Sequence, residues 1–274
     1  NTRPFMTPKY VRTRPIVALI HQLAREYWFY ETPWPLSWVG YHYLEKAWLG
    51  HYRNVKTIAV SESTRRDLLD WGFVDVRIVP EGLSVPVVDE VPNKEQKPTL
   101  LFVGRLKRVK KPDHAIRAFQ VVREEVPDTR LWIVGTGYFR GELDRMDTEG
   151  VHFMGRVEDP VKIDLMTRAH VLLFPAVREG WGLTITEANA RGTPVVGYNV
   201  HGVMDAVVHG VTGILVDPND WLAMAYECVS LLEDHSRCIH MRTKAIEFAR
   251  RFSWEASARD FVTCIEEERI DAPE

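Results

Sequence analysis

The chain has 274 residues, of which 45% are hydrophobic and 27% charged, and its formal net charge is −3. This profile is typical of a folded globular protein and excludes a disordered or fibrous chain. No apolar run approaches the roughly 20 residues that a membrane-spanning helix needs. The 3 cysteines have no Cys-x-x-Cys spacing, which predicts buried or idle thiols of a reducing compartment rather than a zinc site.

The first third of the chain contains three short strand candidates, at residues 15–20, 57–60 and 76–79. A helix ending near Trp71 is expected to be capped by Ser61 or Ser63. Three strands make only part of a sheet. The proline-rich, charged segment 86–98 predicts a linker between domains.

Short apolar runs then alternate with helix-sized segments. A helix is expected from Pro112 to about Val126, because proline is favourable at a helix start. Continuous apolar strands alternating with helices predict a doubly wound parallel sheet over residues 99–250. The predicted strands are 99–103, 130–134, 151–154, 171–174, 194–197 and 213–216.

The strongest chemical motif runs from Arg178 to Ala188 and contains two glutamates, Glu179 and Glu187. The first glutamate lies in a glycine-containing loop after a buried strand, and the second lies about one turn into a helix expected to start near Leu183. Loop amides and the positive end of that helix favour an anion. The two carboxylates can accept hydrogen bonds from sugar or ribose hydroxyls.

A second motif is the basic loop 104–111, which leaves the first strand of the predicted sheet and suits a diphosphate. A third is the glycine turn 135–141, which has one residue too many for a dinucleotide fingerprint. We expect this turn to let a nucleotide or a helix approach closely. The sequence Asp-x-Asp, a common metal-holding pair on nucleotide-sugars, does not occur in the chain.

Together these motifs resemble the retaining glycosyltransferases of GT-B architecture, specifically their family four, the glycosyl transferases group 1. Three residues depart from the usual pattern: Glu81 stands where asparagine is usual, Trp181 where phenylalanine is, and Asp205 where glutamate is. Further segments match in order along the chain, namely His21 after an early strand, 58–61, 78–82, 153–157, 201–213 and 252–254.

The resemblance implies an α/β fold with two Rossmann-like domains, of which the amino-terminal one is incomplete. A partial acceptor-side domain would span residues 1–85, and the linker 86–98 would lead to a donor-binding domain over 99–250. The carboxy-terminal helix, 251–274, would pack back across the domains. Because Asn1 is not a methionine and the family's glycine-rich opening loop is missing, we expect a fragment that is weak or inactive as a transferase.

The resemblance also implies roles for individual residues. Arg105 and Lys110 would hold the donor diphosphate and stabilise the leaving group, Glu187 would bind the ribose hydroxyls, and Glu179 and His21 would contact the transferred sugar. These implied catalytic residues are Glu179, Arg105, Lys110 and His21. The other implied donor-binding residues are Gly104, Gly137, Arg156, Val157, Gly180, Trp181, Gly182 and Leu183. Neither a metal nor a cofactor is expected, since Arg, Lys and a helix end can replace Mg²⁺ as the charge clamp.

The expected reaction is therefore the transfer of a sugar, with retention of configuration, from a UDP- or GDP-sugar to a glycan or lipid-linked acceptor in the cytoplasm. Two alternatives stay open: a nucleotide-sugar-binding protein without transferase activity, and another GT-B enzyme such as a phosphorylase or an epimerase. A phosphorylase would need inorganic phosphate, whereas an epimerase would need no acceptor.

The amino-terminal segment differs from the rest in charge and in aromatic content. Residues 1–56 carry eight basic and three acidic side chains, a balance of +5, which leaves −8 for the remainder. Residues 27–52 contain ten aromatic side chains. This combination predicts either a peripheral contact with the inner face of a membrane through residues 1–56 or the aromatic core of a domain. A nucleic-acid partner is not expected, because the chain as a whole is acidic.

Overall fold

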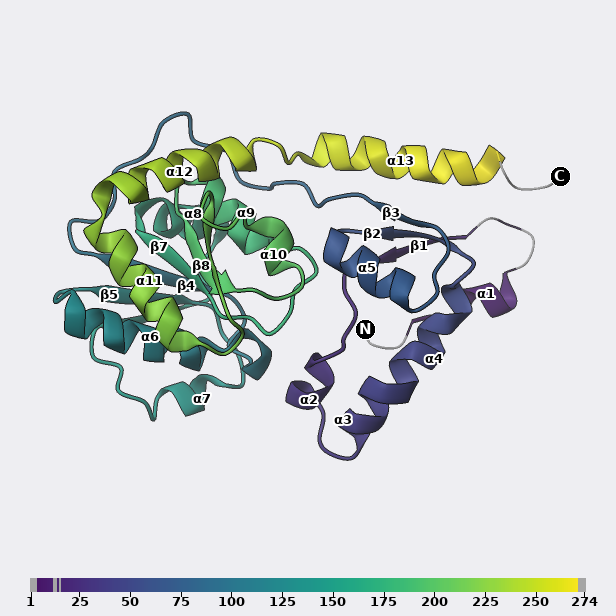
Figure 1. Ribbon diagram of the computed structural model, residues 1–274, viewed down its shortest axis with the longest axis horizontal. Coiled ribbons are helices and arrows are strands. Elements are labelled where there is room, and N and C mark those ends of the chain that lie inside the picture. The colour runs from purple at the N-terminus through teal and green to yellow at the C-terminus, as the bar shows by residue number, and fades with distance from the viewer. Residues whose placement is uncertain (1–3, 12–13, 15, 271–274) are drawn as a thin grey trace. The chain divides into compact units, whose positions relative to one another are not determined.

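The computed structural model describes residues 4–11, 14 and 16–270, which form two compact units (Figure 1). Unit 1 comprises residues 1–82, 178–181 and 252–274, and unit 2 comprises 83–177 and 182–251. Some predicted features lie outside the described residues, namely the basic residues Arg3 and Arg12, the strand candidate's first residue Pro15, and the end of the carboxy-terminal segment, 271–274.

Unit 1 is built on a three-stranded parallel sheet in the order β1-β2-β3. Ala18, Ile20 and Ala59 face a cluster that contains Leu68 of the helix α5, whereas Ile58 on the other face contacts residues of the long helix α13. The sheet is therefore covered on both sides, as a parallel sheet requires. The bounds are β1 Val17–Ile20, β2 Lys56–Ala59, α5 Glu62–Asp70, β3 Val76–Ile78 and α13 Trp254–Ile270.

The helices from α2 to α4 extend away from the strands of unit 1 as an arm, whereas α1 lies near the end of α4 that is closest to the strands (Figure 1). Gly40 allows this arm to fold tightly, because a β-carbon there would collide with the indole of Trp28. The Trp28 indole nitrogen in turn donates a hydrogen bond to the buried carboxylate of Glu45 at 3.2 Å. The elements are α1 Thr7–Tyr10, α2 Tyr27–Glu31, α3 Leu36–Val39, the π-helix η1 Gly40–Leu44, α4 Glu45–Leu49 and the 3₁₀-helix η2 Gly50–Tyr52.

Unit 2 is a six-stranded, all-parallel sheet in the order β6-β5-β4-β7-β8-β9. The strand β4 pairs with β5 on one side and with β7 on the other, so the strand order reverses between β4 and β7. In open parallel sheets, ligands bind outside the carboxyl ends of the strands at such a reversal. The strands are β4 Thr99–Val103, β5 Arg130–Val134, β6 Val151–Gly155, β7 Val171–Phe174, β8 Val195–Tyr198 and β9 Gly213–Val216.

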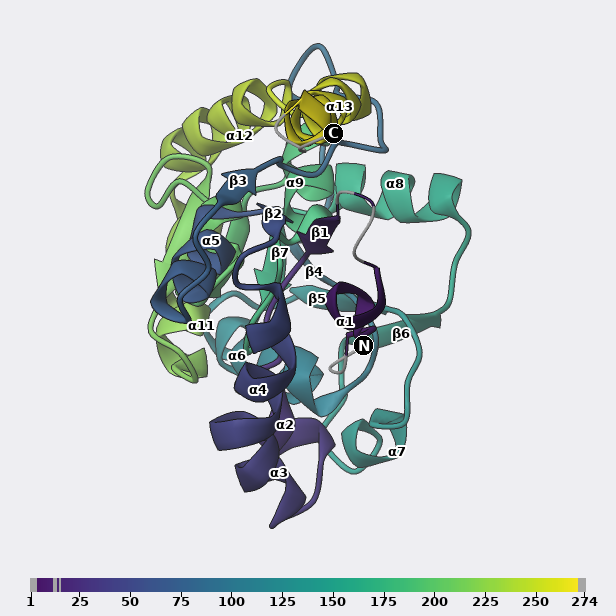
Figure 2. The ribbon, with the colours of Figure 1, turned by 90° about the vertical axis from the view of Figure 1, so that its right-hand side faces the viewer.

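Alternate residues of these strands face two different helical layers (Figure 1 and Figure 2). Leu100 and Phe102 pack against α6 and α11, whereas Leu101 packs in the cluster that contains residues of α8, α9 and α10. The helices of unit 2 are the 3₁₀-helix η3 Arg108–Lys110, α6 Pro112–Glu125, α7 Arg140–Leu143, α8 Asp159–Arg168, α9 Leu183–Ala190, α10 Val203–Ala206, α11 Trp221–Glu233 and α12 His235–Ala249.

The predicted α/β class with parallel sheets is confirmed, and several details differ. The strand β6 was expected to be buried, but it lies at the sheet edge and exposes His152 and Met154. The segment before it was expected to form a full helix, yet its named helix is the single turn α7. The segment 86–98 was expected to be a linker; it belongs to unit 2, where Arg191 donates to the carbonyl of Pro86 at 2.9 Å.

Candidate functional site

The basic loop after β4 is anchored by its apolar residues and presents its charged ones. Leu106 and Val109 are each only 1% exposed, whereas Arg105 is exposed and Lys110 half-buried. The Lys110 ammonium lies 5.8 Å from the ring centroid of Phe174, the last residue of β7. The loop therefore carries a positive charge back across the carboxyl edge of the sheet, where the strand order reverses.

The glycine turn after β5 serves this same loop. A β-carbon on Gly135 would collide with the carbonyl of Gly104, and one on Gly137 would collide with the carbonyl of Leu106. The Leu106 amide also donates to the carbonyl of Thr136 at 3.0 Å. We expected a nucleotide or a helix to approach these glycines; the segment that they admit in this structure is the neighbouring basic loop. The adjacent predicted residues differ in burial: Arg156 is exposed and Val157 is half-buried.

Glu187 lies on α9 and pairs with a lysine that the sequence did not single out. Its Oε1 atom lies 3.1 Å from Nζ of Lys162 on α8, and the two side chains are only 11% and 20% exposed. Burial raises the pKa of Glu187, and the charge and hydrogen bond of Lys162 counteract that rise. Lys162 also contacts Asp159 at 3.3 Å. The helix α9 begins at Leu183, and the residue that precedes it, Gly182, has a φ of +90°, which favours glycine.

In unit 1, His21 follows β1 and donates a hydrogen bond to the carboxylate of Glu81. The His21 Nδ1 atom lies 2.6 Å from Oε1 of Glu81, and this bond raises the pKa of the imidazole. The sequence noted Glu81 only as a departure from the family's asparagine. That Glu81 is the partner of His21 could not be predicted from the sequence, because 60 residues separate the two.

The first half of the paired-glutamate motif also belongs to unit 1. Residues 178–181 are part of that unit, whereas Gly182, Leu183 and Glu187 are part of unit 2. Gly180 is packed so closely that an added β-carbon would lie 2.5 Å from the carbonyl oxygen of His21. Glu179 is half-buried beside it. The structure thus brings Gly180 of the motif against His21, and it assigns the two glutamates to different units.

Three other findings bear on the site. Among the described residues, no cluster of three or more His, Cys, Asp or Glu side chains could hold a metal ion. In the same part of the chain, no helix combines the length and the apolar character that crossing a membrane requires. The three cysteines, Cys228, Cys238 and Cys264, are buried and free, as predicted.

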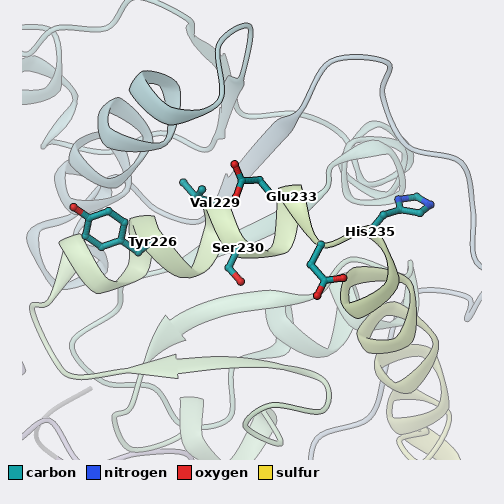
Figure 3. Close-up of a pocket in the computed structure, with 6 residues that line it drawn as sticks. Tyr226, Val229, Ser230, Glu233 and His235 are labelled. Atoms are coloured by element: carbon teal, nitrogen blue, oxygen red, sulfur yellow. The ribbon is translucent and has the colours of Figure 1, made fainter.

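An open hollow of about 630 Å³ lies where α11 meets α12 (Figure 3). Its lining side chains do not converge on one point: Ser230 projects to one side of α11, and Val229 and Glu233 project to the other (Figure 3). None of the predicted site residues lines this hollow.

The all-parallel sheet, whose strand order reverses between β4 and β7, places unit 2 among the doubly wound α/β proteins. Residues 88–252 match the family model described as glycosyl transferases group 1, which covers more than half of the chain. The chain belongs to this family.

Similarity to individual proteins is consistent with that membership. The chain is 34% identical over 173 residues to a D-inositol 3-phosphate glycosyltransferase of Thermobispora bispora, which covers 58% of this chain and 40% of the relative. The match therefore spans about two fifths of the relative's length.

Two solved structures show the same fold. Sucrose-phosphate synthase from Thermosynechococcus elongatus has a TM-score of 0.77 at 22% identity, covering 93% of this chain and 68% of that one. Anabaena HepE in complex with UDP and glucose has a TM-score of 0.75 at 18% identity, covering 93% of this chain and 72% of that one. The fold thus matches GT-B glycosyltransferase structures.

Proposed function

We propose that this chain carries the donor-binding side of a retaining glycosyltransferase of family four, with a UDP- or GDP-sugar as donor. The observation that carries the proposal is the pair of loops at the reversal of the six-stranded sheet. One loop supplies the ammonium of Lys110 beside Phe174, and the other leads into α9 with its part-buried Glu187. A cation and a helix amino terminus favour the diphosphate of such a donor, and a carboxylate can accept hydrogen bonds from its ribose hydroxyls.

In the proposed reaction, Arg105, Lys110 and the amides that begin α9 stabilise the diphosphate as the glycosidic bond breaks. Glu187 accepts hydrogen bonds from the ribose hydroxyls, and Glu179 contacts the transferred sugar. The transition state resembles an oxocarbenium ion. Attack by the acceptor from the face of the leaving group gives retention, and the fixed positive charges take the place of a metal ion.

Calorimetric titration of UDP, GDP and ADP into the chain, with and without EDTA, tests the proposal. We expect one nucleotide to bind equally well in EDTA. Glu187→Ala and Lys110→Ala should each weaken it about 10- to 100-fold, because a hydrogen bond to a charged group contributes about 1.5–3 kcal/mol. Lys97→Ala is the matched control, since Lys97 precedes β4 and pairs with the exposed Asp128. Absence of binding by all three nucleotides, or equal losses in Lys97→Ala, would refute the proposed site.

We also propose that the acceptor is a glycan or a lipid-linked sugar, reached by peripheral contact of unit 1 with the cytoplasmic face of a membrane. Several large side chains support this, because they are exposed on one short stretch of unit 1: Phe29 49%, Trp34 81%, Leu36 52%, Trp38 45% and Tyr43 60%. Aromatic side chains with nearby cations favour an anionic lipid surface. Flotation with anionic and with neutral vesicles tests this, and equal binding to both, or none, contradicts it.

The alternative prediction, that the aromatic side chains of residues 27–52 form the core of a domain, holds for only some of them. Trp28 and Tyr52 are 7% and 8% exposed and pack inside unit 1. Replacing Trp34 and Trp38 with serine should therefore reduce vesicle binding without unfolding unit 1, whereas the same change at Trp28 should destabilise it.

A further inference from the structure

Arg178 is buried between two carboxylates of unit 1. Its guanidinium side chain is only 4% exposed, and its Nη1 atom lies 3.0 Å from Oε2 of Glu26, the residue before α2. Its Nη2 atom pairs with the carboxylate of Asp67 on α5. A planar guanidinium can donate in two directions at once, which the point charge of a lysine cannot do with the same geometry. One side chain therefore ties the segment 178–181 to two separate helices.

The rest of this short segment is fixed at three further points. The Tyr27 hydroxyl donates to the Arg178 carbonyl at 3.1 Å. Gly180 lies against the His21 carbonyl, where a side chain would not fit. The indole of Trp181 meets the ring of Phe252 edge-on, with centroids 5.1 Å apart. Between these buried anchors stands Glu179, which remains half-exposed.

The choice of a charged residue at position 178 calls for a reason other than stability. A buried arginine must be desolvated, and an apolar side chain of similar volume often serves stability as well or better. Ion pairs with defined directions do, however, fix geometry. At this position the geometry concerns the segment 178–181, in which Gly180 lies against the His21 carbonyl and Glu179 is half-buried.

We propose that Arg178 is a positioning residue: its two ion pairs hold the segment 178–181 in unit 1 and thereby fix Glu179 for its proposed contact with the transferred sugar. The inference rests on the proposed function, because it is through Glu179 that Arg178 acts. The nucleotide itself is held by residues of unit 2 and does not depend on Arg178.

A double-mutant cycle measured with UDP and UDP-glucose tests this inference. Relative to UDP, the affinity for UDP-glucose should fall about tenfold in Glu179→Gln and by a similar factor in Arg178→Met. In the Arg178→Met background, Glu179→Gln should add less than a twofold further loss, because the carboxylate is already misplaced. Arg178→Lys should restore part of the affinity. Arg66→Met, which removes an exposed arginine of α5, is the matched control and should change the affinity for neither UDP nor UDP-glucose.

Hydrogen exchange of the peptide that contains residues 178–181 supplies a readout that needs no ligand. Arg178→Met should speed its exchange at least tenfold, and Arg66→Met should not. If Arg178→Met fails to fold, the triple variant Glu26→Gln, Asp67→Asn, Arg178→Met replaces the stranded carboxylates by neutral amides and repeats both measurements.

The outcomes separate the two proposals. Additive effects of Arg178→Met and Glu179→Gln, equal losses for UDP and UDP-glucose, or unchanged exchange of residues 178–181 would each overturn the positioning function. A wild-type chain that binds none of UDP, GDP and ADP but shows the expected exchange would instead overturn the proposed donor site.

Discussion

The ion pair between Lys162 and Glu187 makes a sharp prediction about stability and pH. Breaking a fully buried pair by removing one partner costs about 3–5 kcal/mol. Here the side chains of Lys162 and Glu187 are 20% and 11% exposed, and Glu187 can take up a proton. Lys162→Met should therefore lower the free energy of unfolding by about 2 kcal/mol at pH 8. For a unit of this size, that loss lowers the melting temperature by about 4–8 °C.

The sign of the pH dependence follows from the direction of the pKa shift. Burial raises the pKa of Glu187, and Lys162 opposes that rise. Removing the lysine in Lys162→Met should therefore raise the pKa of Glu187 further. A folded state that holds its proton more tightly than the unfolded chain is favoured at low pH and loses that advantage as the pH rises through the folded pKa. Burial lowers the pKa of Lys162, but Glu187 and Asp159 raise it, and the result is a raised pKa. Lys162 of the wild-type chain therefore stays charged from pH 5 to pH 8. The destabilisation should therefore be small at pH 5 and full at pH 8.

Thermal unfolding at pH 5 and pH 8, followed by circular dichroism, is the assay. Lys162→Arg should retain most of the stability, and the double variant Lys162→Met, Glu187→Gln should lose this pH dependence, because the buried carboxyl with the raised pKa has been replaced by a neutral amide. Lys97→Met removes a pair that is largely exposed and should cost less than about 1 kcal/mol at both pH values. The reasoning is refuted if Lys162→Met costs the same at pH 5 as at pH 8.

Two further predictions concern His21 and Leu106. Glu81→Gln should lower the pKa of His21 in an NMR titration, and it should reduce stability below the folded pKa of His21 rather than above it, because the pair is charged only there; an unchanged titration midpoint would contradict the assigned hydrogen bond. Leu106→Ala should cost about 2–5 kcal/mol, because Leu106 is 1% exposed in the core of unit 2; denaturant unfolding no different from that of Leu222→Ala, at a side chain 42% exposed, would show that the basic loop is not anchored there.

The sequence predicted the strands of unit 2 well, because buried parallel strands are continuous apolar runs that stand out from their surroundings. β4 and β5 have the predicted bounds, and Ser61 caps α5 by accepting a hydrogen bond from the Thr64 amide. The strand β8 begins one residue later than expected and includes Tyr198, which is 1% exposed. Its predicted first residue, Pro194, has no amide proton to donate to a neighbouring strand.

The partners of the site residues could not be predicted in the same way. Lys162 and Glu187 are 25 residues apart on different helices, and Arg178 and Asp67 are 111 apart. Such pairs depend on the order of strands and on how helices pack, which a local pattern does not contain. The aromatic segment shows the same limit, since composition could not distinguish the buried Trp28 from Trp34, which is 81% exposed.

The glutamate motif shows how continuous sequence can serve two parts of a fold. Val177 belongs to unit 2, the next four residues belong to unit 1, and the chain returns to unit 2 at Gly182, whose positive φ permits the turn. Glu179 is thereby fixed by the surroundings of Arg178, and Glu187 by Lys162. Because Glu179 belongs to unit 1 and Glu187 to unit 2, their substitutions should be separable: Glu187→Ala should weaken binding of the bare nucleotide, whereas Glu179→Gln should weaken only binding of the sugar-bearing donor.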